Sequence, residues 1–223
     1  MNGKITEKDL YEAVKDIKNN VLPKLHPRRD LKKFERKERV YCEFLDMLVT
    51  FTVPIDANPD MHIVVTKSIM EHVNMQPEEL LKYAMANVEK NWMMERLDVM
   101  LEQFSGLPSE RLESPVYILT ATGNTQGASV IISEEIMKAV SDRIGGSVLI
   151  LPSSIHEVLV MKDPDGSDYE NMLLMVRTVN RDVVSDADYL SDNVYVYDNG
   201  HFQIITEGLA EEDTKIGFVP ITS

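Results

Sequence analysis

The sequence predicts an α+β protein with a mainly antiparallel sheet, built from hairpins that alternate with helices packed on it. Three times along the chain, a pair of segments rich in β-branched and aromatic residues is followed by apolar residues at helical spacing. Parallel strands would need a long crossover between the members of each pair, so closely spaced pairs favour antiparallel hairpins. Helices packed on such a sheet are typical of the α+β class.

Residues 1–39 are expected to form an N-terminal helix and a basic segment. Thr6 is a candidate N-cap, and apolar residues follow it at helical spacing until Pro23 interrupts the pattern. The stretch LHPRRD then predicts a loop, and residues 28–39 form the basic segment.

Residues 40–104 are expected to form a hairpin and a helix. The segment 40–53 is apolar on both faces, which predicts one central strand, and residues 61–67 are its expected partner. A proline followed by two glutamates predicts that a helix begins at Pro77 and continues weakly to about Gln103.

Residues 115–206 are expected to form a second α+β subdomain, after a linker at SGLPSERLESP. The segments VYILTAT and GASVIIS predict a hairpin joined by GNTQ, SVLILP and IHEVLVMK predict two more strands, and NVYVYD and HFQIIT predict a last hairpin. Ser133 is the expected cap of one helix, and Ser167 with Glu170 forms a capping box for another, after a DPDGSD turn. The successive parts are also compatible with one compact domain.

The composition is that of an ordinary globular protein. Hydrophobic residues make up 43% of the 223 residues and charged residues 27%, which is enough to bury a sizeable core. Cys42 is the single cysteine, so the chain has no internal disulfide, which fits a reducing compartment. The first ten residues are polar, and the longest apolar runs fall far short of the roughly 20 residues that span a bilayer. We therefore expect a cytoplasmic protein without a membrane partner.

The net charge of −14 is unevenly distributed. Residues 1–39 carry 12 Lys and Arg against 7 Asp and Glu, whereas residues 40–223 carry 11 against 30. The last stretch, residues 207–223, is an acidic tail that we expect to be loosely held.

The basic segment has two interpretations. Acidic residues are interleaved with the basic ones and no pattern of stacking aromatics accompanies them, which favours a segment folded against the acidic remainder of the chain. Leu31 and Phe34 are expected to pack in that contact. The alternative is a nucleic-acid-binding arm, for which the candidate binding residues are Arg28, Arg29, Lys32 and Lys33.

Several segments together resemble one protein family. They follow one another in the order and spacing that we associate with DUF5688, an uncharacterised bacterial family of unknown function from Gram-positive anaerobes. The resemblance covers roughly residues 27–198 and implies no activity, cofactor or substrate. Its most specific patterns are PSSIHE and LSDxVYxYD, and its segments are FLDMLVTFTV, MQPEELLKYAMANVEKN, PVYILTATGNTQGASVII, LPSSIHEVLVM, MVRTVN and YLSDNVYVYD.

The stretch ILPSSIHEVLV is the part of the sequence that looks most like catalytic chemistry. A serine nucleophile needs its oxygen within about 3 Å of an imidazole nitrogen, with a carboxylate behind the ring. On a strand, Ser154 and His156 would share a face with Cβ atoms about 6.5–7 Å apart, and Glu157 would point to the opposite face. No G-x-S-x-G elbow is present. A tight turn after Pro152 is therefore the favoured interpretation, and a hydrolase site is the alternative.

Two other polar residues are candidate site residues. Asp46 interrupts the most apolar predicted strand, and Asn180 ends the apolar stripe of a predicted helix. Either is a candidate to join His156 in an internal polar network, because buried polar groups need partners. Such a network is structural or lines a pocket, and in the second case Asn180 and Glu157 are candidate binding residues and Asp46 a catalytic carboxylate.

No metal or cofactor is expected. The five histidines show no metal-ligand spacing, and the calcium-like DPDGSD stretch has its glycine at the wrong position. Phosphate-binding glycine loops are also absent from the sequence. Cys42 lies in a strand pattern, so we expect a buried thiol rather than a nucleophile.

These observations favour a non-enzymatic cytoplasmic binding or interaction protein with an unknown protein or small-molecule partner. The first alternative is a serine-type hydrolase that uses Ser154, His156 and a distant carboxylate such as Asp46. The second is a nucleic-acid-associated protein that uses residues 28–39. A pocket that joins Ser154, His156 and Asp46 would favour the first alternative, and a continuous exposed basic face would favour the second.

Overall fold

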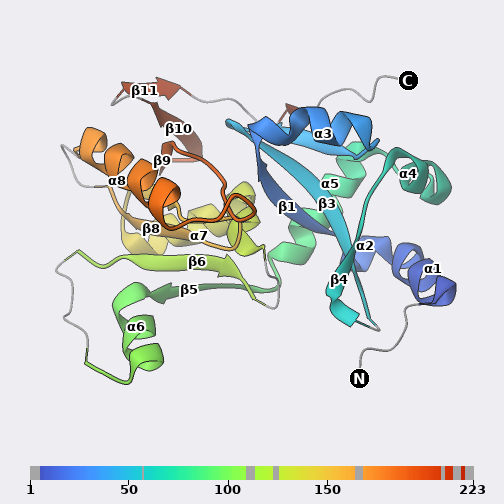
Figure 1. Ribbon diagram of the computed structural model, residues 1–223, viewed down its shortest axis with the longest axis horizontal. Coiled ribbons are helices and arrows are strands. Elements are labelled where there is room, and N and C mark those ends of the chain that lie inside the picture. The colour runs from blue at the N-terminus through green and yellow to red at the C-terminus, as the bar shows by residue number, and fades with distance from the viewer. Residues whose placement is uncertain are drawn as a thin grey trace. The chain divides into compact units, whose positions relative to one another are not determined.

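Two antiparallel sheets, each with its own helices, make up the part of the chain that the structure describes (Figure 1). The structure is a computed structural model, which describes residues 6–56, 58–108, 114–122, 126–163, 168–206, 209–212 and 217–218. The chain divides into unit 1, Met1–Lys90 with Ile216–Ser223, and unit 2, Asn91–Lys215. The predicted α+β class with antiparallel sheets is confirmed.

Unit 1 is organised around one long buried strand, β3 (Met47–Ile55). This strand pairs with β1 on one side, and with β2 and then β4 on the other. The other elements of unit 1 are α1 (Glu7–Lys15), α2 (Ile17–Asn20), β1 (Leu22–Pro27), η1 (Arg28–Asp30), α3 (Leu31–Arg36), β2 (Tyr41–Phe44), β4 (Asn58–Val64), α4 (Lys67–Val73), α5 (Pro77–Val88) and β12 (Gly217–Phe218).

The single strand predicted over residues 40–53 is wrong, because the segment forms the hairpin of β2 and β3. Leu45 adopts a φ of 55°, in the left-handed region, and the chain reverses there and at Asp46. An apolar residue rarely takes this conformation, which is why the turn leaves no sequence signal. The expected partner strand is present as β4, which pairs with the second half of β3.

The loop predicted at LHPRRD is also wrong in its first half, because Leu22–Pro27 forms β1 at the edge of the sheet. Pro23 and Pro27 lie within this strand. Proline donates no ladder hydrogen bond, so an edge strand accommodates it where a central strand does not.

The core of unit 1 lies between this sheet and helices α1, α2 and α5. Leu80, Ala84 and Val88 form the buried stripe of α5 at a spacing of four residues. The amide of Asn87 donates to the carbonyls of Lys18 and Val21 at 3.1 and 3.0 Å, which joins α5 to the end of α2.

Unit 2 contains a sheet with the order β11-β10-β9-β7-β8-β6-β5. Its strand β7 is buried throughout, and α8 packs on the sheet through Leu173 and Val176. The elements of unit 2 are β5 (Trp92–Arg96), α6 (Leu97–Ser105), β6 (Tyr117–Ala121), η2 (Gly127–Ile132), α7 (Glu134–Ile144), β7 (Val148–Pro152), β8 (Val158–Lys162), α8 (Tyr169–Asp182), β9 (Val194–Asp198), β10 (His201–Thr206) and β11 (Leu209–Glu212).

Two predictions for the segment 92–132 are wrong. The helix expected to run to about Gln103 is broken by β5, and a new helix, α6, begins at Leu97. The segment GASVIIS forms the 3-10 helix η2 instead of a strand, so β6 pairs with β5 and β8. In the tail, Leu209–Glu212 forms β11, which pairs with β10, and Gly217–Phe218 forms β12, which pairs with β2; that the tail is loosely held stays a prediction.

Some predicted loops fall largely outside the described residues. The expected capping residue Ser167 lies outside the described residues. The N-cap of α8 in the described chain is Asp168, whose side chain accepts from the backbone N–H of Asn171. The others are parts of the linker at 105–115, of GNTQ at 123–126 and of DPDGSD at 163–168.

Candidate functional site

The residues between β7 and β8 form a tight turn, as the favoured interpretation of the sequence predicted. The hydroxyls of Ser153 and Ser154 both donate to Oε1 of Glu157, at 3.0 and 2.9 Å. The backbone N–H of Ser154 donates to the carbonyl of Glu157 at 3.3 Å. Glu157, a candidate binding residue, therefore closes the turn as an acceptor for both serines.

His156 contacts a carboxylate that the sequence did not suggest. Its Nε2 lies 3.0 Å from Oδ1 of Asp188, and Oδ2 of Asp188 accepts from the Ser185 hydroxyl at 2.7 Å. The Ser185 hydrogen bond and then the His156 ring hold the pKa of the Asp188 carboxyl below its usual range. The two side chains are 39% and 42% exposed, so this pair lies in solvent rather than in the core.

The predicted hydrolase geometry is not formed at this turn. The oxygen of Ser154 accepts from the backbone N–H of His156 at 3.0 Å and donates to Glu157. A serine nucleophile would instead place this oxygen against the imidazole ring. The groups at the turn can hold the backbone and orient the imidazole ring. Nε2 of His156, however, contacts Asp188 and not a serine.

The turn is anchored from two other parts of unit 2. The backbone N–H of Ile155 donates to the carbonyl of Asp188 at 2.9 Å, and the hydroxyl of Thr120 donates to the carbonyl of His156 at 2.8 Å. Gly127 packs directly against this contact, because a Cβ at that position would lie 2.0 Å from Oγ1 of Thr120. Segments 32 and 36 residues away along the chain therefore fix the turn.

Asn180 and His156, two of the three residues considered for an internal polar network, have separate partners. The amide of Asn180 donates to the carbonyl of Ser191 at 2.9 Å and to Oδ1 of Asp192 at 2.8 Å, which ties α8 to the segment before β9. His156 contacts Asp188 instead. Asp46 lies half-buried in the β2–β3 turn of unit 1, and its place in such a network stays a prediction.

The basic segment is folded into unit 1. Phe34 is fully buried, and Nη2 of Arg28 lies 3.0 Å from Oε1 of Glu43 on β2. The other candidate binding residues of the segment, Arg29, Lys32 and Lys33, are exposed on η1 and α3. Phe34 supplies the apolar contact expected of the segment.

A second polar group, on β1 and β3, was missed by the sequence analysis. Nε2 of His26 lies 2.8 Å from Oγ1 of Thr50, and both side chains are buried. Burial, followed by the charges of Lys24, Arg39 and Lys33, lowers the pKa of His26 to about 3. The imidazole is therefore neutral at ordinary pH, and the group was missed because these residues were expected in a loop.

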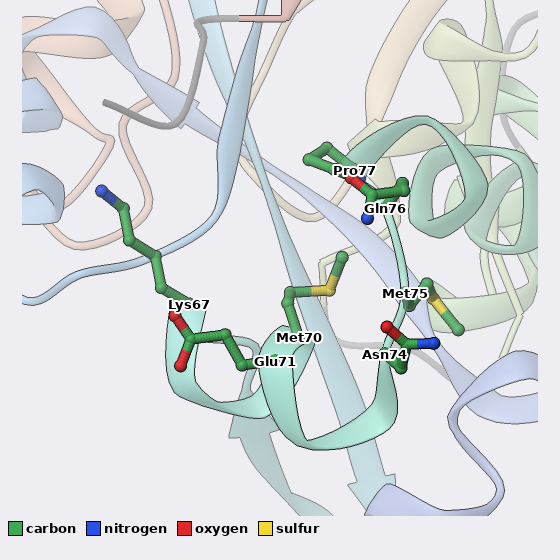
Figure 2. Close-up of a pocket in the computed structure, with 7 residues that line it drawn as sticks. All are labelled: Lys67, Met70, Glu71, Asn74, Met75, Gln76 and Pro77. Carbon is green, nitrogen blue, oxygen red and sulfur yellow. The ribbon is translucent and has the colours of Figure 1, made fainter. Parts of the chain in front are cut away.

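A pocket of about 430 Å³ lies between α4 and the start of α5 (Figure 2). The Met70 side chain points toward Gln76 and Pro77, while the Lys67 side chain extends away from them (Figure 2). All its lining residues belong to the single stretch 67–77. The pocket therefore gathers no groups from distant parts of the sequence, and its lining contains no histidine, cysteine or serine.

The described residues offer no further reactive centre of the kinds considered from the sequence. Burial raises the pKa of the Cys42 thiol to about 12, which leaves it protonated and unreactive. No group of three or more His, Cys, Asp or Glu side chains within the described chain could hold a metal ion. In the same residues, every helix is too short or too polar to cross a membrane.

Comparison with known proteins places the chain in a family. The model of a family of unknown function, DUF5688, matches residues 3–199, so the chain belongs to this family, as the resemblance predicted. No curated protein and no solved structure matches the chain.

Proposed function

We propose that this member of the DUF5688 family is a non-enzymatic interaction protein, and that unit 2 holds a cationic protein partner through an apolar patch on the second half of α6 and the residue after its C-cap. The patch consists of Leu101, Phe104 and Leu107. The observation that carries the proposal is the Phe104 side chain, which is 83% exposed.

The exposure of this patch argues for an unfilled interface. Three large apolar side chains lie within the seven residues 101–107, and Leu101 and Leu107 are 53% and 68% exposed. Single exposed apolar residues are ordinary, whereas several exposed within a short stretch are typical of an interaction surface. Aromatic anchors such as Phe104 typically contribute most of the binding energy at such surfaces.

The charge of unit 2 argues for a cationic partner. Unit 2 contains 8 Lys and Arg against 22 Asp and Glu, so it carries a net charge of −14. A field of this sign attracts basic surfaces and repels nucleic acid at long range. A basic protein or peptide with its own apolar side chains would complement both features of the unit.

The geometry of the serine turn favours binding over hydrolysis. Each serine hydroxyl of the turn donates to Glu157, and His156 is paired with Asp188. A hydrolase that uses Ser154 would have to break these contacts before its oxygen could reach the imidazole.

Site-specific photocrosslinking tests this proposal. A photoreactive phenylalanine analogue is placed at Phe104 and, in a matched control, at Tyr11, an exposed aromatic residue on α1 of unit 1. In extracts of cells that naturally express the chain, irradiation should give one discrete adduct at position 104 and none at position 11. Raising the salt concentration before irradiation should weaken the adduct, because screening weakens attraction between charged surfaces.

Three outcomes would contradict the proposal. The first is labelling at position 104 that does not exceed the control. The second is an adduct with twice the mass of the chain, which would identify the occupant of the patch as a second copy. The third is an adduct that is insensitive to salt, which would remove the argument for a cationic partner.

A further inference from the structure

A small pocket in unit 2 is assembled from three separate parts of the sequence. It has a volume of about 200 Å³ and is lined by Ser114, Pro115, Tyr117, Ile144 and Lys162. These residues belong to the segment that enters β6, to the end of α7 and to the end of β8. The pocket between α4 and α5 is formed by one continuous stretch, whereas this pocket exists only because strands and a helix distant in sequence fold together.

The strand register explains why these side chains meet. Tyr117 of β6 pairs with Val160 of β8, and Lys162 lies two residues further along β8, so the three side chains share one face of the sheet. Helix α7 lies over that face, since the guanidinium carbon of Arg143 is 5.5 Å from the centre of the Tyr117 ring. Ile144, the last residue of α7, therefore borders the same pocket as Tyr117 and Lys162.

Two cations at this pocket lack an acidic partner within the part of the chain that the structure describes. Lys162 forms no ion pair there. Arg143 donates to a backbone carbonyl of β5 at 2.9 Å and stacks on Tyr117, and neither contact neutralises its charge. Arg96, the cross-strand neighbour of Tyr117, is by contrast paired with Asp98 at 2.6 Å. Acids are abundant in this unit, with 22 Asp and Glu against 8 Lys and Arg, so two unbalanced cations favour an anionic ligand.

The rest of the lining combines one hydroxyl with apolar walls. The Ser114 hydroxyl makes no hydrogen bond to another residue of the described chain, so it can donate to a ligand. Ile144 and Pro115 supply aliphatic surface, and the half-buried Tyr117 supplies an aromatic ring. A volume of about 200 Å³ is below the roughly 300–1,000 Å³ of pockets for drug-sized molecules, so the pocket fits a small ligand.

We infer that this pocket binds a small organic monocarboxylate with an apolar body. The carboxylate accepts from the Lys162 ammonium and the Ser114 hydroxyl, and the body packs against Ile144 and the Tyr117 ring. A single negative charge suits the unit better than several, because a net charge of −14 repels polyanions at long range. The site shares no residue with the patch on α6 and is independent of the proposed interaction function.

Titration of the whole chain with benzoate at pH 7, followed by NMR of the isoleucine methyl groups, tests the inference. Benzoate carries one carboxylate on an aromatic ring, and it should bind saturably with a Kd of about 1 mM or lower. Benzamide keeps the ring without the charge, and acetate keeps the charge without the ring. Each should bind at least about tenfold more weakly than benzoate, because each loses one of the two kinds of contact that the pocket offers.

The same titration locates the site. The methyl resonances of Ile144 should shift as benzoate is added, whereas those of Ile17, a buried residue of unit 1, should not. This measurement needs no substitution, so it tests the site even where a variant fails to fold. Shifts at Ile17 without shifts at Ile144 would place the ligand elsewhere and contradict the inference.

Four variants make the test specific. Lys162→Met should weaken benzoate binding by about tenfold or more, because it removes the charge-assisted contact, and Lys162→Arg should retain most of the binding. Ser114→Ala should weaken binding by a smaller factor, since a neutral donor contributes less. Lys138→Met is the matched control, because it removes an exposed lysine of α7 that does not line the pocket, and it should leave binding unchanged.

Three further results would overturn the inference. The first is the absence of saturable benzoate binding. The second is binding of benzamide or acetate that is as tight as that of benzoate, which would remove the need for the charge or for the apolar body. The third is binding that Lys138→Met weakens as much as Lys162→Met does, which would indicate general attraction to surface lysines. Photocrosslinking at Phe104 does not depend on these results, so failure of this site and failure of the proposed function are distinguishable.

Discussion

The two units share an antiparallel architecture but differ in charge. Unit 1 contains 15 Lys and Arg against 15 Asp and Glu and is neutral, whereas unit 2 contains 8 against 22 and carries the entire net charge of −14. The basic segment is therefore balanced by acids of its own unit, such as Glu43, and the strongly acidic part of the chain is a separate unit. A boundary in charge along the sequence does not identify a boundary in the fold.

The two units also use a histidine differently. His26 in unit 1 is buried, neutral and bonded to a threonine, whereas His156 in unit 2 is half-exposed and bonded to a carboxylate. The first is part of a closed sheet face, and the second holds a surface turn to another loop. Four substitutions test whether the two units unfold independently and how much individual residues contribute to stability.

Val49→Asp should have the largest effect, and it should act on unit 1. Val49 is fully buried between Leu25 of β1 and Cys42 of β2, so the variant places an unpaired charge in the sheet. We expect a loss of about 4 kcal/mol or more, enough to unfold the unit. Hydrogen exchange should show lost protection in β1 to β4 and retained protection in β6 to β10. Loss of protection in both units together would show that they unfold as one cooperative unit.

Gly127→Ala should have the next largest effect on stability, and it should act on unit 2. The added Cβ would lie 2.0 Å from the Thr120 hydroxyl and 2.8 Å from the His156 carbonyl, and backbone must move to admit it. We expect destabilisation of about 3 kcal/mol in urea unfolding. Gly145→Ala is the control, because nothing lies within 4 Å of its Cβ and only its φ of 82° opposes the change, at about 1 kcal/mol. Equal costs for the two variants would contradict the close packing at the turn.

His26 should make unit 1 sensitive to acid. Its pKa falls from 6.5 to about 3 on folding, so below pH 6.5 the unfolded state binds a proton that the folded state does not. Stability is therefore fully present above pH 6.5 and is lost as the pH falls toward 3. Between pH 7 and pH 5, wild type should lose about 2 kcal/mol more than His26→Gln in urea unfolding. Equal losses would show that the imidazole is protonated in the folded state.

Ser154→Ala should have the smallest effect. The variant loses the hydrogen bonds to Glu157 and to the His156 backbone, but Ser153 still donates to Glu157. We expect a cost of roughly 1 kcal/mol. A broad esterase screen should show no turnover for either protein. Robust wild-type turnover that this change abolishes would contradict the proposed interaction function and support the hydrolase alternative.

The sequence was informative where the chain obeys local rules. The turn after Pro152 and the last hairpin follow from residue types at adjacent positions, and both are present. Local rules failed at Leu45, whose left-handed conformation an apolar residue seldom adopts, and at Pro23 and Pro27, which an edge strand tolerates. In each case the sheet overrides the preference of the residue.

The candidate site was less predictable than the fold because its contacts are distant in sequence. Asp188 contacts His156 across 32 residues, and Phe34 contacts His26 only because α3 folds back over β1. One sequence contains no signal for such pairs. Burial could not be foreseen either, since the lowered pKa of His26 depends on a strand that was expected to be a loop because of its prolines.

Strand β12 has a consequence for synthesis of the chain. Its residues Gly217 and Phe218 pair with Cys42 and Glu43 of β2, so the first unit to leave the ribosome is completed by residues made after the whole of the second. Until then β2 is an open edge, the part of a sheet most prone to pairing with another chain. The edge of β2 is thus open to pairing with another chain while unit 2 is being translated.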